Sequence, residues 1–332
     1  MALPDFLLAG APKAGTTALH VALARHPQLY LSRTKEPKFF LADGRRPALA
    51  KGPGDARTTR ELVWRREEYE ALFDPAPPGA LLGESTSLYL YDAAAQARIA
   101  ALIPDVRVIA VLRDPIDRAH SNWAHLWSAG LEPEADFVAA CGLEDRREAD
   151  GWAPFWRYLK LGRYGEQLES LWSHLPRENT LVLRYQDLRE SPVPTLDRIC
   201  AFLGVETGVL AEVPAENVTT HASSSPANRL VAQALRLGTA IDHSLPVSPL
   251  GPVNRALARH LQREQRPRQP LTPDQRDALI PRIADDVRRL EQLTGEDFGH
   301  WVDPHRDSTR SALTPQGRIG TAHNSIDRPI RD

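Results

Sequence analysis

Short apolar runs separated by longer amphipathic stretches recur along most of the chain. Four such runs of five to seven residues lie at 6–10, 80–84, 106–112 and 180–185. Runs of this length and composition are typical of strands that are buried on both faces. The stretches with apolar residues at helical spacing are 18–25, 116–128, 192–202 and 274–293. Because helices separate the strands, we expect parallel pairing and an α/β fold, a three-layer sandwich with a central parallel sheet.

Proline and glycine mark where some of these elements begin and end. Pro115 is suited to open the helix after the third strand, and Gly204 is suited to end the helix at 192–202. Residues 44–59 are rich in Gly, Pro, Ala and Arg, so we expect an exposed loop there that lies over the functional site. The last helix should pack on the core through one face, made of Leu279, Ile283, Val287 and Leu290.

The composition is that of one globular domain. The chain has 332 residues, 42% of them apolar, so we assign 1–302 to a single domain and 303–332 to a polar tail. A formal net charge of −2 gives no overall basic field, which argues against nucleic acid as a partner. No stretch has the length of a membrane span, and the N-terminus lacks a signal-peptide pattern. We therefore expect a cytoplasmic protein without an integral membrane segment.

The lysines are clustered in the sequence, and the cysteines are isolated. Only five of the 41 basic residues are lysines, yet Lys13, Lys35 and Lys38 lie close together in the sequence. Such clustering favours compact, mobile point charges at one place. The two cysteines, Cys141 and Cys200, have no ligand partners at useful spacing and are expected to be small apolar residues. We expect neither a disulfide nor a bound metal.

The segment between the first strand and the first helix has the outline of a phosphate-binding loop. It reads Gly10-Ala-Pro-Lys-Ala-Gly-Thr-Thr17. Backbone N–H groups in such a loop, with the N-terminus of the next helix, hold an anion. Thr16 stands where the nucleoside triphosphatase pattern has lysine, and the lysine lies inside the loop as Lys13. The loop can therefore hold a phosphate, but it gives no reason to expect magnesium.

This loop resembles that of the sulfotransferases that use 3′-phosphoadenylyl sulfate (PAPS), which reads Pro-Lys-x-Gly-Thr-Thr. Here the residues are Pro12, Lys13, Ala14, Gly15, Thr16 and Thr17. The resemblance covers about residues 5–205. It implies a P-loop NTPase-like fold in which this loop binds the 5′-phosphosulfate end of PAPS. The alternative is an ordinary glycine-containing turn between a strand and a helix.

A second family feature is a strand followed by Arg-Asp-Pro and by a helix that carries a serine. Arg113-Asp114-Pro115 and Ser121 match it, and the resemblance implies that Arg113 and Ser121 hold the 3′-phosphate of the cofactor. The alternative is an arginine paired with a neighbouring aspartate. Arg266 and Arg268 resemble the basic loop that closes on the same phosphate, although a basic linker is an equal alternative.

Sulfuryl transfer resembles phosphoryl transfer, in which catalysis depends on positioning and charge neutralisation. Lys13 would stabilise the negative charge that grows on the departing phosphate of adenosine 3′,5′-bisphosphate (PAP). The resemblance also implies that Glu36, in Lys35-Glu36-Pro37-Lys38-Phe39-Phe40, takes the proton from the acceptor hydroxyl. Lys38, often histidine in the glycan-modifying members, would steady the sulfonate or an anionic acceptor. The alternative is a surface glutamate paired with Lys35 or Lys38.

Further residues bear on the base and the acceptor. Some sulfotransferases use histidine as the base, so His20, His120 and His125 come into question, and we expect His20 and His120 to be structural or surface residues. Glycan enzymes tend to read Glu-Lys-Thr where this chain has Glu84-Ser85-Thr86, which argues against heparan-like acceptors.

The sequence thus predicts a PAPS-dependent O-sulfotransferase that transfers a sulfuryl group to a hydroxyl of a sugar, glycolipid or small natural product and releases PAP. Residues 41–80 and 205–270 are expected to shape the acceptor pocket. A P-loop kinase or NTPase and a non-catalytic nucleotide-binding protein are the alternatives. The sequence gives no indication of oligomeric state.

Overall fold

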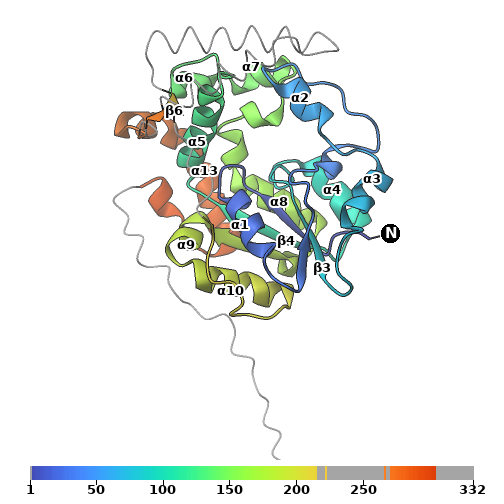
Figure 1. Cartoon of the computed structure of the whole chain (residues 1–332). Coiled ribbons are helices and arrows are strands. Elements are labelled where there is room, and N and C mark those ends of the chain that lie inside the picture. Colours follow the sequence, from blue (N-terminus) through green and yellow to red (C-terminus); the bar gives the residue numbers. More distant parts are fainter. Residues whose placement is uncertain (1, 215–220, 223–264, 267–269, 304–332) are drawn as a thin grey trace, which may run out of the picture.

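The computed structural model describes residues 2–214, 221–222, 265–266 and 270–303, with backbone alone at the two dipeptides (Figure 1). Five parallel strands form its main sheet, in the order β2-β3-β1-β4-β5. The strands are β1 (Phe6–Gly10), β2 (Leu29–Leu31), β3 (Leu81–Ser85), β4 (Arg107–Leu112) and β5 (Thr180–Arg184). A separate antiparallel pair, β6 (His221–Ala222) with β7 (Gln265–Arg266), lies against the helix α5 (Pro115–Ser128).

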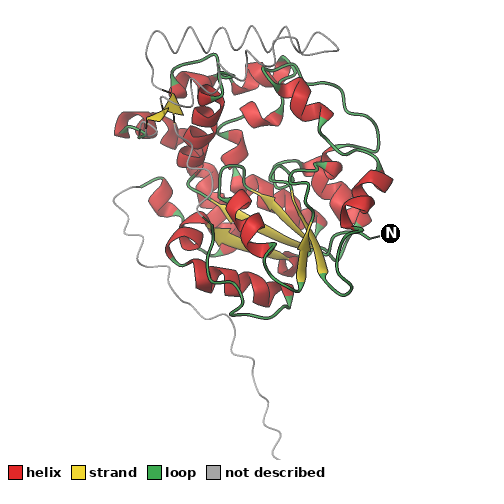
Figure 2. Cartoon of the chain, viewed as in Figure 1, coloured by secondary structure: helices red, strands yellow, loops and turns green. Residues whose placement is uncertain are grey.

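Helices flank the sheet, so the molecule has the predicted sandwich of layers (Figure 2). The remaining α-helices are α1 (Thr16–Leu23), α2 (Asp55–Arg60), α3 (Arg66–Glu70), α4 (Ala93–Leu102), α6 (Phe137–Gly142), α7 (Glu144–Ala149), α8 (Tyr164–His174), α9 (Tyr185–Glu190), α10 (Pro192–Leu203) and α13 (Pro273–Thr294). Single 3₁₀ turns are η1 (Phe39–Leu41), η2 (Ala71–Phe73), η3 (Pro154–Trp156), η4 (Lys160–Gly162), η5 (Arg177–Asn179) and η6 (Gly299–Trp301). None of the described helices is long and apolar enough to cross a membrane.

The strand order places a topological switch at β1. The connection from β1 to β2 passes over β3 in one direction, and the connection from β3 to β4 passes over β1 in the other. Right-handed crossovers then put α1 on one face of the sheet and α4 on the opposite face, where α4 packs on α8 and α8 on α13. Crevices at such switch points, beyond the carboxyl ends of the strands, are where open α/β sheets bind ligands. The fold therefore directs attention to the ends of β3, β1 and β4.

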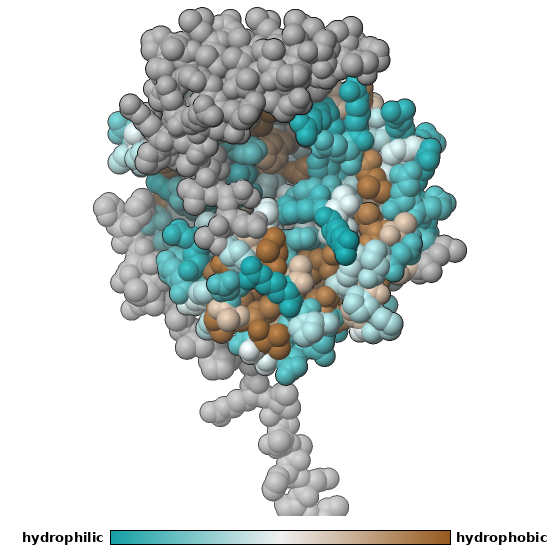
Figure 3. Space-filling model, viewed as in Figure 1, coloured by the Kyte–Doolittle hydropathy of each residue, from teal (hydrophilic) through white to brown (hydrophobic). Residues whose placement is uncertain are grey.

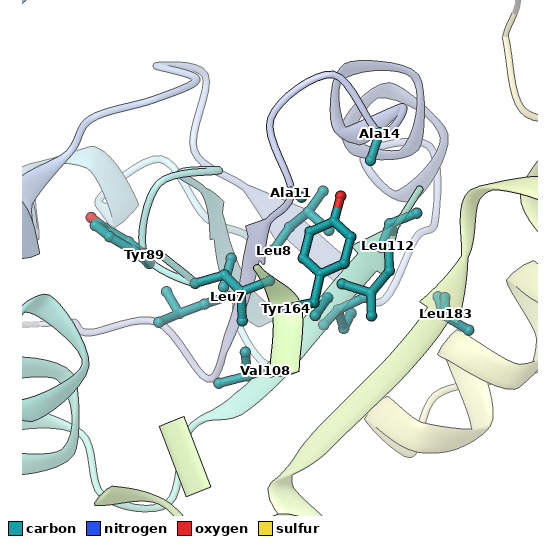
Figure 4. Packing of buried hydrophobic residues seen from close by; sticks show 14 of the residues in the cluster. Leu7, Leu8, Ala11, Ala14, Tyr89, Val108, Leu112, Tyr164 and Leu183 are labelled. Atoms are coloured by element: carbon teal, nitrogen blue, oxygen red, sulfur yellow. The ribbon is translucent and has the colours of Figure 1, made fainter. Parts of the chain in front are cut away.

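The core lies around the two central strands. Phe6, Leu7 and Leu8 in β1 and the apolar residues of β4 are buried, because helices cover both faces of the sheet. Figure 4 shows side chains from β1, β4 and β5 packing with Tyr164 at the start of α8 and with Ala11 and Ala14 of the loop after β1. The backbone of that loop is thus held on the core of the protein.

The helix boundaries follow the predicted signals. Pro115 opens α5, and Gly204 ends α10 with a positive φ of 69°. The apolar face expected for the last helix is buried in α13. Cys141 and Cys200 are unbridged and buried, as predicted.

Two parts of the prediction need correction, and three others stay open. The strand β2 is missing from the prediction, because three residues are too short for a periodic signal. Residues 44–59 are not loop throughout, since α2 begins at Asp55, whose buried carboxylate accepts hydrogen bonds from Trp156 Nε1 and Ala153 N, both at 2.8 Å. The lid function, the domain boundary at 302 and the polar tail remain predictions, and 304–332 lie outside the described residues.

Candidate active site

The loop after β1 has the backbone of an anion-binding turn. Lys13 and Gly15 both have positive φ, 66° and 83°, and Gly15 is the N-cap of α1. The carbonyl of Lys13 accepts a hydrogen bond from Arg113 Nη1 at 3.0 Å, and the carbonyl of Pro12 accepts one from the buried Arg118 at 3.4 Å. Within the loop the N–H of Ala14 donates to Ala11 O at 3.2 Å. The N–H groups that follow, at the start of α1 beside Thr16 and Thr17, are of the kind that hold an anion.

The end of β4 supplies a second cationic position next to the loop. Arg113 lies at 4.9 Å over the ring of Tyr185, the first residue of α9, and does not pair with Asp114. Asp114 instead caps α5 and accepts from Arg276 of α13 at 2.7 Å, which answers the alternative of a local Arg–Asp pair. Arg276 also contacts Asp117 at 2.8 Å. These contacts bind the last helix to the strand end that carries Arg113.

A pocket of about 370 Å³ opens at this junction, lined by Arg113, Asp117, Pro270, Leu271 and Arg276. Ser121 lies two turns along α5 and is buried, on the same helix whose first turn borders the pocket. In Figure 3 hydrophilic residues dominate the visible face, and hydrophobic ones form small groups between them. The assignment of Arg113 and Ser121 to a 3′-phosphate remains a prediction.

Glu36 is held at the end of β3 by several contacts. Its backbone has a φ of 58°, and its N–H donates to Ser85 O at 2.8 Å. Its carboxylate accepts from Ser87 Oγ at 2.8 Å and from Ser87 N at 3.2 Å, and it contacts Lys35 Nζ at 3.1 Å. One quarter of the Glu36 side chain is exposed. The alternative pairing with Lys35 is thus present, but Glu36 is a fixed, part-buried carboxylate and not a free surface charge.

The other predicted site residues are placed less completely. Lys38 has a φ of 61° at the start of η1, and its N–H donates to Thr86 Oγ1 at 3.2 Å. Arg266, in β7, pairs with His221 of β6, the strand that lies against α5. Arg268 lies outside the described residues. The roles assigned to Lys38, Arg266 and Arg268 remain predictions.

The three histidines differ in environment. His20 Nδ1 lies 2.8 Å from Ser85 Oγ, and burial followed by the nearby Lys35 lowers the pKa of His20 to about 4. His120 is buried between Trp123 and Phe137, as expected of a structural residue. The imidazole of His125 is accessible, yet surrounding protein atoms and the Lys13 ammonium lower its pKa to about 4. The effect of the Lys13 ammonium on this pKa indicates that the Lys13 side chain lies near His125.

The three strand ends bring two kinds of chemistry together. Lys13, Arg113 and the hydroxyls of Thr16, Thr17 and Ser121 are donors suited to a bisphosphate. Glu36 is a hydrogen-bond acceptor on the other side of the topological switch at β1. Its charge acts to raise the pKa of His20 in α1, against the larger lowering by burial, so Glu36 lies near the helix that follows the loop. The described part of the chain contains no group of three or more His, Cys, Asp and Glu side chains that could hold a metal ion. The expectation of a metal-free reaction stays a prediction.

The fold and site define an α/β protein whose first strand is followed by a loop with the backbone of an anion-binding turn. A family model described as "Sulfotransferase domain" matches residues 3–230, which is more than half of the chain. The chain therefore belongs to the sulfotransferase domain family. The crystal structure of a sulfotransferase from Alicyclobacillus acidocaldarius superimposes with a TM-score of 0.70 at 26% identity, covering 91% of this chain and 99% of that one.

Two kinds of curated relative match the chain. Human bifunctional heparan sulfate N-deacetylase/N-sulfotransferase 3 is 30% identical over 209 residues, 61% of this chain and 22% of the relative. Mouse heparan sulfate glucosamine 3-O-sulfotransferase 3B1 is 28% identical over 205 residues, 61% of this chain and 47% of the relative. The chain thus spans less than half the length of these relatives.

Sequence reasoning missed several residues at this site. Tyr185 packs against Gly15, and Arg276 ties α13 to α5, yet neither belongs to a short motif next to the loop. In the sequence, Glu84 draws attention only through the comparison of Glu84-Ser85-Thr86 with glycan enzymes. Its place at the end of a predicted strand, 80–84, is the one signal that the sequence offers.

Proposed function

We propose that this protein transfers a sulfuryl group from PAPS to a hydroxyl of a sugar, a glycolipid or a small natural product, and releases PAP. The observation that carries the proposal is the arrangement at the ends of β3, β1 and β4. Cationic and hydroxyl donors gather after β1 and β4, and the fixed carboxylate of Glu36, in the segment after β2, lies beside the end of β3. Membership of the sulfotransferase domain family supports the same reaction.

Each part of the site has a task in this reaction. PAPS supplies the sulfuryl group and the phosphate from which it departs. The loop of Pro12, Lys13, Ala14, Gly15, Thr16 and Thr17 binds the 5′ end, and Arg113 with Ser121 binds the 3′-phosphate. Lys13 neutralises the charge that grows on the leaving oxygen, an interaction stronger in the transition state than in the ground state.

Glu36 acts as the general base in this proposal. A hydroxyl is a poor nucleophile at neutral pH and must lose its proton during attack. Glu36 can take that proton because Ser87 holds its carboxylate in place while a quarter of its side chain stays open to solvent. Lys38 follows at the start of η1, where its ammonium would steady the sulfonate or an anionic acceptor.

The relatives act on both amino and hydroxyl groups by their names, so the bond formed must be tested directly. The experiment incubates the protein with labelled PAPS and two sets of acceptors, sugars with hydroxyls only and sugars with a free amine. Mass spectrometry and NMR identify the sulfated position. The proposal expects O-sulfated product and a loss of about 10²- to 10⁴-fold in turnover for Glu36→Gln, with unchanged PAP affinity. Sulfation at nitrogen alone, or full activity of Glu36→Gln, would contradict it.

A further inference from the structure

A buried carboxylate is linked by hydrogen bonds to the segment that carries Glu36. Glu84, in β3, is fully buried, and within the described part of the chain its partners are hydroxyls rather than a cation. Its Oε1 accepts from Tyr89 at 2.7 Å and from Tyr69 at 3.1 Å, and its Oε2 accepts from Thr86 at 2.9 Å. Burying a carboxylate without a cation is costly, so the position of Glu84 calls for a physical explanation.

Two of the three hydroxyls also contact the catalytic segment. Thr86 Oγ1 accepts a hydrogen bond from the backbone N–H of Lys38 at 3.2 Å. Tyr89 Oη accepts one from the N–H of Phe40 at 3.3 Å. Each hydroxyl therefore donates to Glu84 and accepts from the segment, which forms two parallel hydrogen-bonded chains from the carboxylate to residues 38 and 40.

The segment needs such support because its backbone is strained. Glu36 and Lys38 both have positive φ, 58° and 61°, which costs a residue with a side chain roughly 1–2 kcal/mol each. The ring of Tyr69 stacks on Phe39 at 4.2 Å, and Val63 N–H donates to Pro37 O at 2.9 Å. The contacts from Glu84 are thus part of a set that holds Glu36 in one position.

Burial raises the pKa of Glu84 to about 7, and the ionised form, which predominates above that pH, is suited to this task because it can only accept. All three hydroxyls must then point their hydrogens at Glu84, and their lone pairs are left for the amides of the segment. A glutamine would present an NH₂ group that competes for one of those lone pairs. The charge therefore sets the direction of every hydrogen bond in the cluster.

We propose that Glu84 is a positioning residue for sulfuryl transfer, which orients the hydroxyls of Thr86 and Tyr89 so that they hold the Lys38 and Phe40 backbone and keep Glu36 aimed at the acceptor. This inference rests on the proposed function, in which Glu36 is the base. We expect Glu84 to affect the chemical step and not PAPS binding, because Thr86 and Tyr89 contact the segment after β2 and not the loop that binds PAPS.

The test uses variants that break single links. Thr86→Val and Tyr89→Phe each remove one hydroxyl between Glu84 and the segment. Glu84→Gln replaces one acceptor oxygen by an NH₂ donor. We expect kcat to fall about 10- to 100-fold, since a displacement near 1 Å has that effect, while the PAP dissociation constant stays within about twofold. Thr86→Ser keeps the hydroxyl and should restore kcat. Tyr69→Phe removes a hydroxyl from the same carboxylate without breaking a link to the segment, so its kcat should fall much less.

A second readout is independent of turnover. Hydrogen exchange of the amides at 38 and 40 should accelerate in Thr86→Val and in Tyr89→Phe respectively, and return to the wild-type rate in Thr86→Ser. Unchanged exchange and kcat in the folded variants would overturn the inference, as would a loss of PAP affinity parallel to kcat. If Glu36→Gln is fully active, the proposed function fails instead, whatever the exchange rates show.

Discussion

Replacing Lys13 by alanine removes the ammonium assigned to the leaving oxygen and leaves the rest of the loop unchanged. Lys13 has a φ of 66°, and alanine meets the same backbone strain there, so the substitution changes the charge and not the conformational cost. The Lys13 carbonyl, bound by Arg113 at 3.0 Å, is kept. Loss of one preorganised donor to a developing oxyanion costs about 10²- to 10³-fold in kcat, or about 3–4 kcal/mol.

The assay measures sulfuryl transfer and PAP affinity for Lys13→Ala beside Lys51→Ala. Lys51 is exposed, and its backbone N–H, which donates to Gly151 O at 3.0 Å, survives the substitution. The position of Lys13 has its own spectroscopic check, since the pKa of His125 should rise from about 4 when the Lys13 ammonium is removed, which an NMR titration measures. Equal losses of kcat in the two variants, with no change at His125, would refute the reasoning.

Three other predictions follow from the same geometry. Gly15→Ala should abolish PAP binding in a calorimetric titration, because a Cβ there would lie 2.9 Å from the ring of the tyrosine that begins α9. Gly44→Ala, with a similar φ and open space around it, should bind PAP normally. Arg276→Met leaves two aspartates without their common partner and should lower the free energy of unfolding by about 3 kcal/mol in denaturant titrations, whereas Met at the exposed Arg288 should cost much less. Burial raises the pKa of Glu84 to about 7, so its protonated form stabilises the fold below pH 4.5 and that stabilisation is lost as pH rises through 7. Glu84→Gln should therefore remove about 3 kcal/mol of the decline in unfolding free energy between about pH 5 and pH 8, and an unchanged decline would argue against a buried Glu84.

Much of the fold could be predicted because burial leaves a local signal. Strands buried on both faces are continuous apolar runs, as at 106–112, and helix ends carry proline or glycine, as at Pro115 and Gly204. The strand β2 has only three residues and leaves no such signal. The strand order could not be derived from the residues, since pairing depends on contacts between segments far apart in the chain.

The site shows the same division. Lys13, Glu36 and Arg113 lie in local motifs, which is why sequence reasoning could name them. The contact of Arg276 with Asp114 joins residues 162 positions apart, and no local pattern indicates it. The sequence also could not show that Glu36 is fixed by Ser87, because that contact depends on how β3 ends beside the segment after β2.

The central claim is that two anion sites at neighbouring strand ends bind opposite ends of one bisphosphate, with a carboxylate facing the transferred group. A crystal structure of the protein with PAP tests it most directly. The account predicts the 5′-phosphate at the amides of residues 14–17 with Lys13 Nζ in contact, and the 3′-phosphate at Arg113 and Ser121. PAP bound at another edge of the sheet, or Lys13 directed away from the 5′-phosphate, would contradict it.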